Sequence, residues 1–138
     1  MKKRCLVLFL VLLVAAGSFA CGKKPVETQA VDYAMTFENQ TGIDISKLEI
    51  RHAEDAEWSE IFLSDGIWEN GYRIPVSMQG QMPIAENGWQ VQATFDGSDT
   101  QKVWSGVEFG DALVFSFSLA DKTYEPLVTV READALAE

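Results

Sequence analysis

The chain has 138 residues, with 21 acidic side chains against 11 basic ones and a formal net charge of −10. So acidic a balance excludes the basic surface that nucleic-acid-binding proteins need. The single histidine excludes a histidine-based metal cluster, and we expect no metal and no cofactor. The length suits one domain with its own core.

The first 20 residues have the order of a secretory signal peptide. Basic residues at positions 2–4 precede an apolar run from Leu6 to Ala16, which is shorter than the roughly 20 residues of a membrane-spanning helix. The segment 18–20 then ends in a small residue directly before Cys21. We therefore expect residues 1–20 to be removed.

This arrangement resembles the lipobox of bacterial lipoproteins, although Ser18 stands where leucine is commonest. The resemblance implies that Cys21 receives a diacylglyceryl group, becomes the first residue and is acylated on its new amine. Two or three acyl chains hold a protein on a membrane durably. The alternative is ordinary cleavage after Ala20, which would release a soluble protein with a free thiol.

The resemblance also implies a location in the bacterial cell envelope. Gly22 stands where an aspartate commonly retains such proteins in the inner membrane. We therefore expect the outer membrane, facing the periplasm, in a two-membraned source and otherwise the outer face of the cell membrane. The polar residues 22–30, with no hydrophobic period, are interpreted as a flexible linker. Removal of Cys5 and lipidation of Cys21 would leave no intramolecular disulfide.

From residue 31 onward, apolar residues alternate with polar ones, which is typical of strands with one buried face. The alternation is clearest in residues 33–37 and 89–95. Further strand-like segments follow at short intervals: 43–50, 67–69, 72–78, 102–109, 112–120 and 124–130. These patterns predict an all-β fold, a single antiparallel β-sandwich of seven or eight strands over residues 31–131, with 132–138 as a frayed tail.

Several local features can also be predicted. Turn residues at Asn39–Gly42 and at Asn70–Gly71 indicate hairpins. A change in the phase of the alternation predicts a β-bulge near Ser46. Pro75 lacks a backbone donor and indicates an edge strand. The spacing of apolar residues in 58–62 predicts a short helical turn.

A second resemblance rests on turn glycines and core aromatic residues. They are Phe37-x-Asn39-x-Thr41-Gly42, Trp58, Leu63, Gly71, Trp89-x-Val91 and Phe95-Asp96-Gly97. This set is similar to a group of small secreted bacterial β-sandwich proteins, many of them uncharacterised lipoproteins with one immunoglobulin-like or transthyretin-like domain. The resemblance covers about two thirds of the domain. It implies a fold and an envelope location but no catalytic residue.

Little in the sequence indicates catalysis. His52 is the only histidine, and no G-x-S-x-G motif supplies a serine nucleophile to pair with it. Neighbouring carboxylates are expected by chance in so acidic a chain, and a solvated face is their simplest interpretation. The run Asp96–Asp99 fits a hairpin turn better than a calcium loop. We therefore predict that the protein is not an enzyme.

Five residues are the candidate partner contacts: Trp68, Trp104, Glu54, Asp55 and Glu57. Trp104 is out of phase with its strand and Trp68 lies at a predicted hairpin, so these two tryptophans are the candidates for exposure. Filling of the core is nevertheless the favoured interpretation for each of the two. Trp89 fits the alternation of its strand and is predicted to be buried.

The resulting hypothesis is a lipid-anchored, non-enzymatic module that binds an unknown envelope protein or a glycan. A carbohydrate-binding module would require two or three exposed, coplanar tryptophans. An inhibitor of an envelope or host hydrolase would require a rigid acidic loop, such as His52–Glu60 or the irregular stretch Gln79–Gly88, that fits a basic cleft. An enzyme is the fourth hypothesis.

Overall fold

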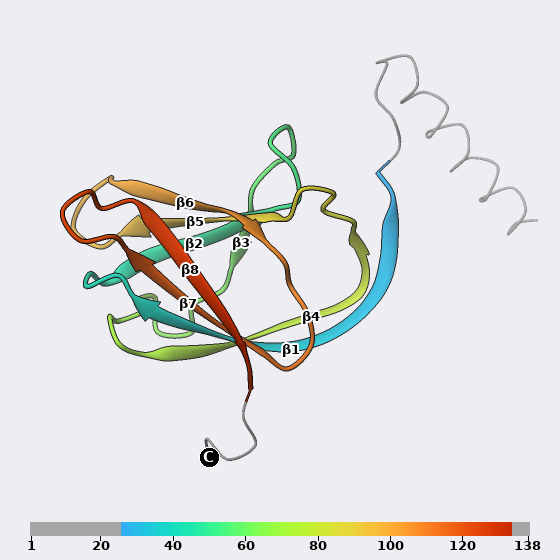
Figure 1. Ribbon diagram of the computed structural model, residues 1–138, viewed down its shortest axis with the longest axis horizontal. Coiled ribbons are helices and arrows are strands. Elements are labelled where there is room, and N and C mark those ends of the chain that lie inside the picture. Colours follow the sequence, from blue (N-terminus) through green and yellow to red (C-terminus); the bar gives the residue numbers. More distant parts are fainter. Residues whose placement is uncertain (1–25, 134–138) are drawn as a thin grey trace, which may run out of the picture.

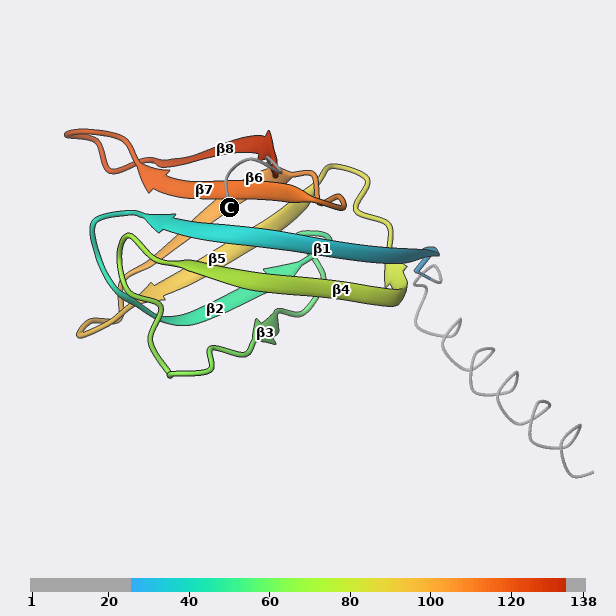
Figure 2. The ribbon, with the colours of Figure 1, turned by 90° about the horizontal axis from the view of Figure 1, so that it is seen from below.

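The computed structural model describes residues 26–133. The predicted signal peptide and Cys21 lie outside the described residues. Eight strands form two four-stranded sheets packed face to face, and residues 26–133 contain no helix (Figures 1 and 2). The predicted all-β sandwich is confirmed. Within the same residues, no helix has the length and hydropathy needed to cross a membrane.

The first sheet has the strand order β4-β1-β7-β8. Its strands are β1 (Thr28–Gln40), β4 (Arg73–Pro83), β7 (Leu113–Leu119) and β8 (Pro126–Glu132). β1 and β4 form a long antiparallel ribbon, whereas β7 runs parallel to only the last part of β1 (Figure 2). β1 begins inside the segment expected to be a linker, because residues 28–30 pair with β4.

The second sheet has the order β3-β2-β5-β6 and is antiparallel throughout. Its strands are β2 (Ile45–Arg51), β3 (Ser59–Ile61), β5 (Trp89–Phe95) and β6 (Gln101–Val107). The register between β2 and β5 shifts between Ile45 and Lys47, so the bulge predicted near Ser46 is confirmed. The edge position predicted from Pro75 is also confirmed, because β4 is an outer strand of its sheet.

The helical turn predicted for residues 58–62 is wrong. Ser59–Ile61 pairs with β2 as the short strand β3. Trp58 lies instead under the guanidinium of Arg51, whose Cζ is 4.2 Å from the ring centroid. Backbone pairing with β2 and this cation–π contact hold the segment extended.

The turn at Asn39–Gly42 exists but joins β1 in one sheet to β2 in the other, so it is not a hairpin. Gly42 has the positive φ (88°) that the turn requires. The buried Asn39 side chain holds the crossing: its amide nitrogen donates to the carbonyls of Ile43 (3.0 Å) and Trp68 (2.9 Å). A turn therefore lies at the predicted residues, but the predicted hairpin is wrong.

The turn at Asn70–Gly71 is likewise present, with Gly71 at φ 88°. The residues before it do not form a strand paired with β4. Trp68 instead makes an isolated bridge to Ile45 in the opposite sheet. The predicted hairpin is wrong because this segment crosses one end of the sandwich.

Aromatic rings fill the space between the sheets. Phe37 packs edge-on against Phe117, with ring centroids 5.0 Å apart, and Phe117 packs against Trp104 at 5.4 Å. Trp89 is buried and stacks on Phe109 at 5.2 Å, which confirms its predicted core position. All residues of the described core lie between Val31 and Val128, so a chain beginning at residue 22 contains them all.

Candidate functional site: an acidic groove at one end of the sandwich

Trp68 is only 2% exposed, so its predicted role as a partner contact is wrong. Its backbone N–H donates to the Ile45 carbonyl at 2.7 Å and its carbonyl accepts from the Ile45 N–H at 3.0 Å. The indole N–H donates to the Tyr72 carbonyl at 2.9 Å. Trp68 therefore closes one end of the core with its polar group satisfied.

Trp104 is also 2% exposed and is no partner contact. The register between β5 and β6 shifts: Trp89 pairs with Val107, and Val91 pairs with Trp104, so β6 has one extra residue between the two pairs. Because of this bulge, Trp104 and Val107 both point inward. The bulge thus changes the alternation of inward and outward side chains along β6. Trp104 therefore points inward, although an uninterrupted alternation would expose it. The indole N–H donates to the carbonyls of Ser118 (3.1 Å) and Leu127 (2.9 Å), joining β6 to the opposite sheet.

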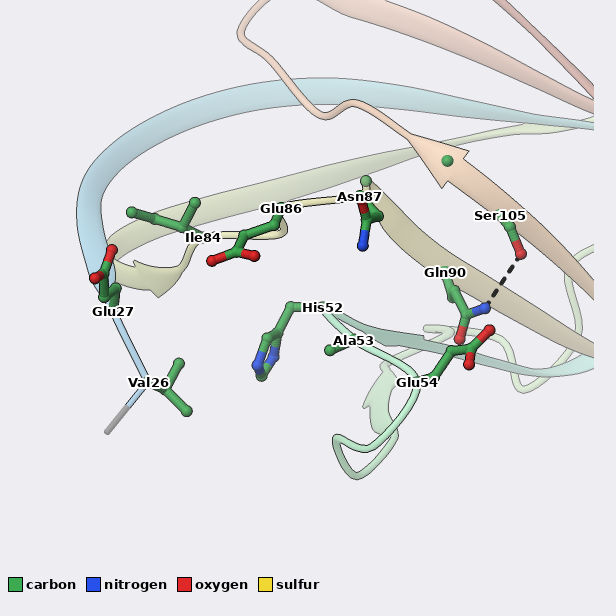
Figure 3. A pocket seen from close by; sticks show the side chains of 12 residues that line it. Val26, Glu27, His52, Ala53, Glu54, Ile84, Glu86, Asn87, Gln90 and Ser105 are labelled. Atoms are coloured by element: carbon green, nitrogen blue, oxygen red, sulfur yellow. Dashed lines mark hydrogen bonds between the residues drawn. The ribbon is translucent and has the colours of Figure 1, made fainter. Parts of the chain in front are cut away.

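The three predicted acidic contacts, Glu54, Asp55 and Glu57, are exposed in the loop between β2 and β3. Only Glu54 lines a groove, which has a volume of about 630 Å³. The groove lies at the end of the sandwich where β1 begins (Figure 3). Asp55 and Glu57 lie outside its lining.

Five parts of the chain line the groove, and Figure 3 shows their side chains around it. The segment just before β1 contributes Val26 and Glu27, and the β2–β3 loop contributes residues 52–54. The β4–β5 loop contributes Ile84 and residues 86–88. Gln90 of β5 and residues 105–106 of β6 complete the lining.

The β1–β4 ribbon positions the start of β1 beside the β4–β5 loop. The ladder continues past the last strand pair, since the Ile84 N–H donates to the Glu27 carbonyl at 3.0 Å. The predicted irregular stretch Gln79–Gly88 is therefore strand as far as Pro83. Only the five residues 84–88 form the loop.

Gly88 lets this loop approach β6 closely. It has a φ of 83°, and a Cβ at this position would lie 2.6 Å from the Gly106 Cα, so only glycine fits. On the other side, the His52 ring packs edge-on against Trp89, with centroids 6.2 Å apart. The β4–β5 loop and the β2–β3 loop therefore both pack at the buried end of β5.

Three carboxylates, those of Glu27, Glu54 and Glu86, line the groove and are exposed. Within residues 26–133, none of them forms a salt bridge or a side-chain hydrogen bond. The same part of the chain has six basic and 19 acidic side chains, a balance of −13. An open groove with unneutralised carboxylates attracts cationic groups.

The groove contains a serine and a histidine without the geometry of a nucleophile and its base. The Ser105 hydroxyl accepts a hydrogen bond from Gln90 Nε2 at 3.2 Å (Figure 3). No hydrogen bond within residues 26–133 joins Ser105 to His52. In this range, no three histidine, cysteine or acidic side chains are grouped so that they could hold a metal ion.

Among the acidic side chains of residues 26–133, only a different carboxylate, that of Glu38, has a clearly shifted pKa. Glu38 of β1 is buried on the outer face of its sheet between Arg73 of β4 and Arg131 of β8, at 2.5 and 2.8 Å. The Ser116 hydroxyl also donates to it. The hydrogen bond from Arg131 is the largest cause that lowers the pKa of Glu38 from 4.5 to about 2, against the opposing effect of burial. This cluster, Glu38 with Arg73, Ser116 and Arg131, links all four strands of the sheet.

No protein-family model matches the chain, and no curated protein sequence matches it significantly. Among solved structures, it is similar to the NMR structure of a protein from Eubacterium rectale. The two chains are 12% identical, with a TM-score of 0.49, and the similarity covers 75% of this chain and 92% of the other. A similarity of this size carries no argument about function.

Sequence reasoning missed the convergence of Glu27, Glu54 and Glu86. It did single out His52–Glu60 and Gln79–Gly88 as separate acidic loops. The signal that could have joined them is the length of the β1–β4 ribbon, which brings Glu27 and the second loop to the same end of the sandwich.

Proposed function

We propose that the protein is a lipid-anchored, non-enzymatic binding module of the bacterial cell envelope, and that its acidic groove binds a basic segment of a partner protein. The observation that carries the proposal is the convergence of three exposed carboxylates, none with a charged partner among residues 26–133, around one open groove. A cationic segment would neutralise carboxylates that no side chain of the described domain neutralises. Complementary charge also speeds association and rejects acidic competitors.

The proposed lipid anchor limits the distance between the groove and the membrane. Val26 lines the groove and follows Cys21 by five residues, which span at most about 18 Å when extended. In a lipid-anchored protein the groove would therefore lie close to the membrane surface. Its partner would be a membrane protein with a basic segment next to the bilayer, or a soluble protein recruited there.

Hydrolase inhibition is the second candidate function. The two loops that an inhibitor would insert into a basic cleft lie side by side around the groove. A carbohydrate platform has no comparable support, because Trp68, Trp89 and Trp104 are buried and none of the four tryptophans is fully exposed.

Affinity capture with matched variants tests the proposal. Immobilised chain 22–138 is exposed to a native envelope extract at low and moderate salt, and retained proteins are identified by mass spectrometry. The groove variant carries Glu27→Gln, Glu54→Gln and Glu86→Gln. The control variant removes the same charge from three exposed turns outside the groove, with Asp65→Asn, Asp99→Asn and Asp121→Asn.

We expect one basic protein to be retained by the unchanged chain and by the control variant, lost from the groove variant, and released as salt rises. Equal loss from both variants would show that net charge, and not the groove, attracts the protein. Retention by the groove variant would contradict the proposal. Inhibition of a captured hydrolase would select the second candidate function.

A further inference from the structure

β8 is an outer strand with an unpaired side. Its only strand partner within residues 26–133 is β7. Backbone hydrogen bonds at both ends of this pair fix which groups face β7: the Ala120 N–H donates to Glu125 and the Ala133 N–H donates to Ala112, both at 2.8 Å. By the alternation of an antiparallel pair, Val128 therefore turns its N–H away from the sheet.

The same alternation applies to Val130, opposite Phe115, and to Glu132, opposite Leu113. Leu127, Thr129 and Arg131 use their N–H groups in the ladder with β7. The free side of β8 thus presents a regular row of backbone donors and acceptors from Val128 to Glu132.

The other three outer strands carry features that block strand addition. β4 contains Pro75 and Pro83, β3 has only three residues, and β6 bears the bulge around Ser105 and Gly106. β8 has a proline only at its first position, Pro126, and no bulge. Its central residues are the least protected edge of the described domain.

Exposed apolar side chains gather on this strand and its hairpin. Leu127 is 50% exposed, Val130 is 48% exposed, and Tyr124, in the turn before β8, is 62% exposed. Backbone groups and apolar side chains are both needed for recognition by strand addition, since the first give affinity and the second give specificity.

The charges around β8 favour one kind of segment at its unpaired edge. Glu125 and Glu132 are exposed at the two ends of β8, while the positive charge of Arg131 is matched by Glu38 at 2.8 Å. A second copy of residues 26–133 would bring a further charge of −13 to this edge. Like charges disfavour that pairing, and basic residues at the ends of an incoming strand favour it.

We propose that β8 is a docking edge for an extended segment of a partner protein, with β-branched apolar residues at its centre and lysine or arginine at both ends. The segment adds a fifth strand to the sheet β4-β1-β7-β8. This edge is independent of the acidic groove.

The test uses the peptide Lys-Lys-Val-Thr-Val-Thr-Val-Lys-Lys, with blocked ends, titrated into ¹⁵N-labelled chain 22–138. NMR shifts and amide hydrogen exchange are followed residue by residue. We expect shifts along β8 and at least about tenfold slower exchange at Val128, Val130 and Glu132. An analogue with glutamate in place of each lysine should bind at least tenfold more weakly.

Val130→Pro removes an outward N–H and leaves the ladder with β7 intact, so it should weaken binding at least tenfold. Ser77→Pro, at an outward position of β4, is the matched control and should not change binding. Val130→Lys retains the backbone and adds a repelling charge, so it gives the same test if Val130→Pro does not fold.

Three outcomes would overturn the proposal. The first is peptide binding that survives both substitutions at Val130. The second is a set of shifts confined to the groove residues. This result would support the proposed function of the groove and would show that the peptide does not bind at the β8 edge. The third is protection of the β8 amides by self-association of the unliganded chain, measured by sedimentation, which would make a second copy the occupant.

Discussion

Glu38 and the three glutamates of the groove show two uses of the same side chain. Glu38 is buried and has two arginines and a serine within hydrogen-bonding distance. Glu27, Glu54 and Glu86 are exposed and have no charged partner among the described residues. A carboxylate that is already paired stabilises the fold, whereas one left unpaired on an open groove is available to a partner. The following predictions test that distinction.

The largest effect is expected on stability from Glu38→Gln. The amide keeps the shape but removes the charge that three donors share, so the free energy of unfolding should fall by about 2 kcal/mol. Urea denaturation of the variant and the unchanged chain measures the difference. A change in the free energy of unfolding under about 0.5 kcal/mol would show that this cluster stabilises the fold no more than an ordinary surface ion pair does.

Acid should remove the same contribution. The folded pKa of Glu38, about 2, lies below its value of 4.5 in the unfolded chain, so the unfolded state takes up the proton first. Its stabilisation is complete above about pH 4.5 and is lost as pH falls towards 2. The stability difference between the unchanged chain and Glu38→Gln should therefore shrink over this range in urea titrations. A constant difference from pH 7 to 2 would contradict the assigned pKa.

The groove variant should behave in the opposite way. Substitutions on an exposed surface usually change the free energy of unfolding by less than about 0.5 kcal/mol, so Glu27→Gln, Glu54→Gln and Glu86→Gln together should leave urea denaturation nearly unchanged. Any change should be a small gain, because the chain carries excess negative charge. A large loss of stability would show that these carboxylates have internal partners.

The smallest effect is expected from Lys47→Ala. Lys47 lies 3.6 Å from Glu49, and its side chain is 47% exposed, so solvent screens the pair. Glu49 also keeps its hydrogen bond from Gln92 Nε2 at 2.9 Å. We expect a loss of about 0.3 kcal/mol in urea denaturation. If Lys47→Ala lowered the free energy of unfolding as much as Glu38→Gln does, the expected difference between buried and solvent-screened charges would be contradicted.

The sequence predicts the elements of this fold better than their connections. Period-two alternation identifies β1 and β5, and the missing donor of Pro75 places β4 at an edge, because these signals depend on near neighbours in the chain. The turn at Asn39–Gly42 is recognisable for the same reason. Whether it returns the chain to the same sheet or the opposite one depends on contacts with Trp68, 29 residues away.

The site is less predictable than the fold. Glu54 could be named as an exposed acidic residue, but its relation to Glu27 and Glu86 exists only after β1 and β4 have paired over eleven positions. Trp104 became a candidate for exposure because it is out of phase with Val103 in the sequence. The register shift between β5 and β6, which turns it inward, depends on pairing with β5 and is not encoded by its near neighbours.

The most direct test of the distinction between paired and unpaired carboxylates is the dissociation constant of the captured partner, measured for Glu38→Gln and for the groove variant under one set of conditions. We predict that Glu38→Gln changes it less than twofold and that the groove variant raises it at least tenfold. Equal weakening by the two variants, or none by the groove variant, would contradict the assignment of the groove as the binding site.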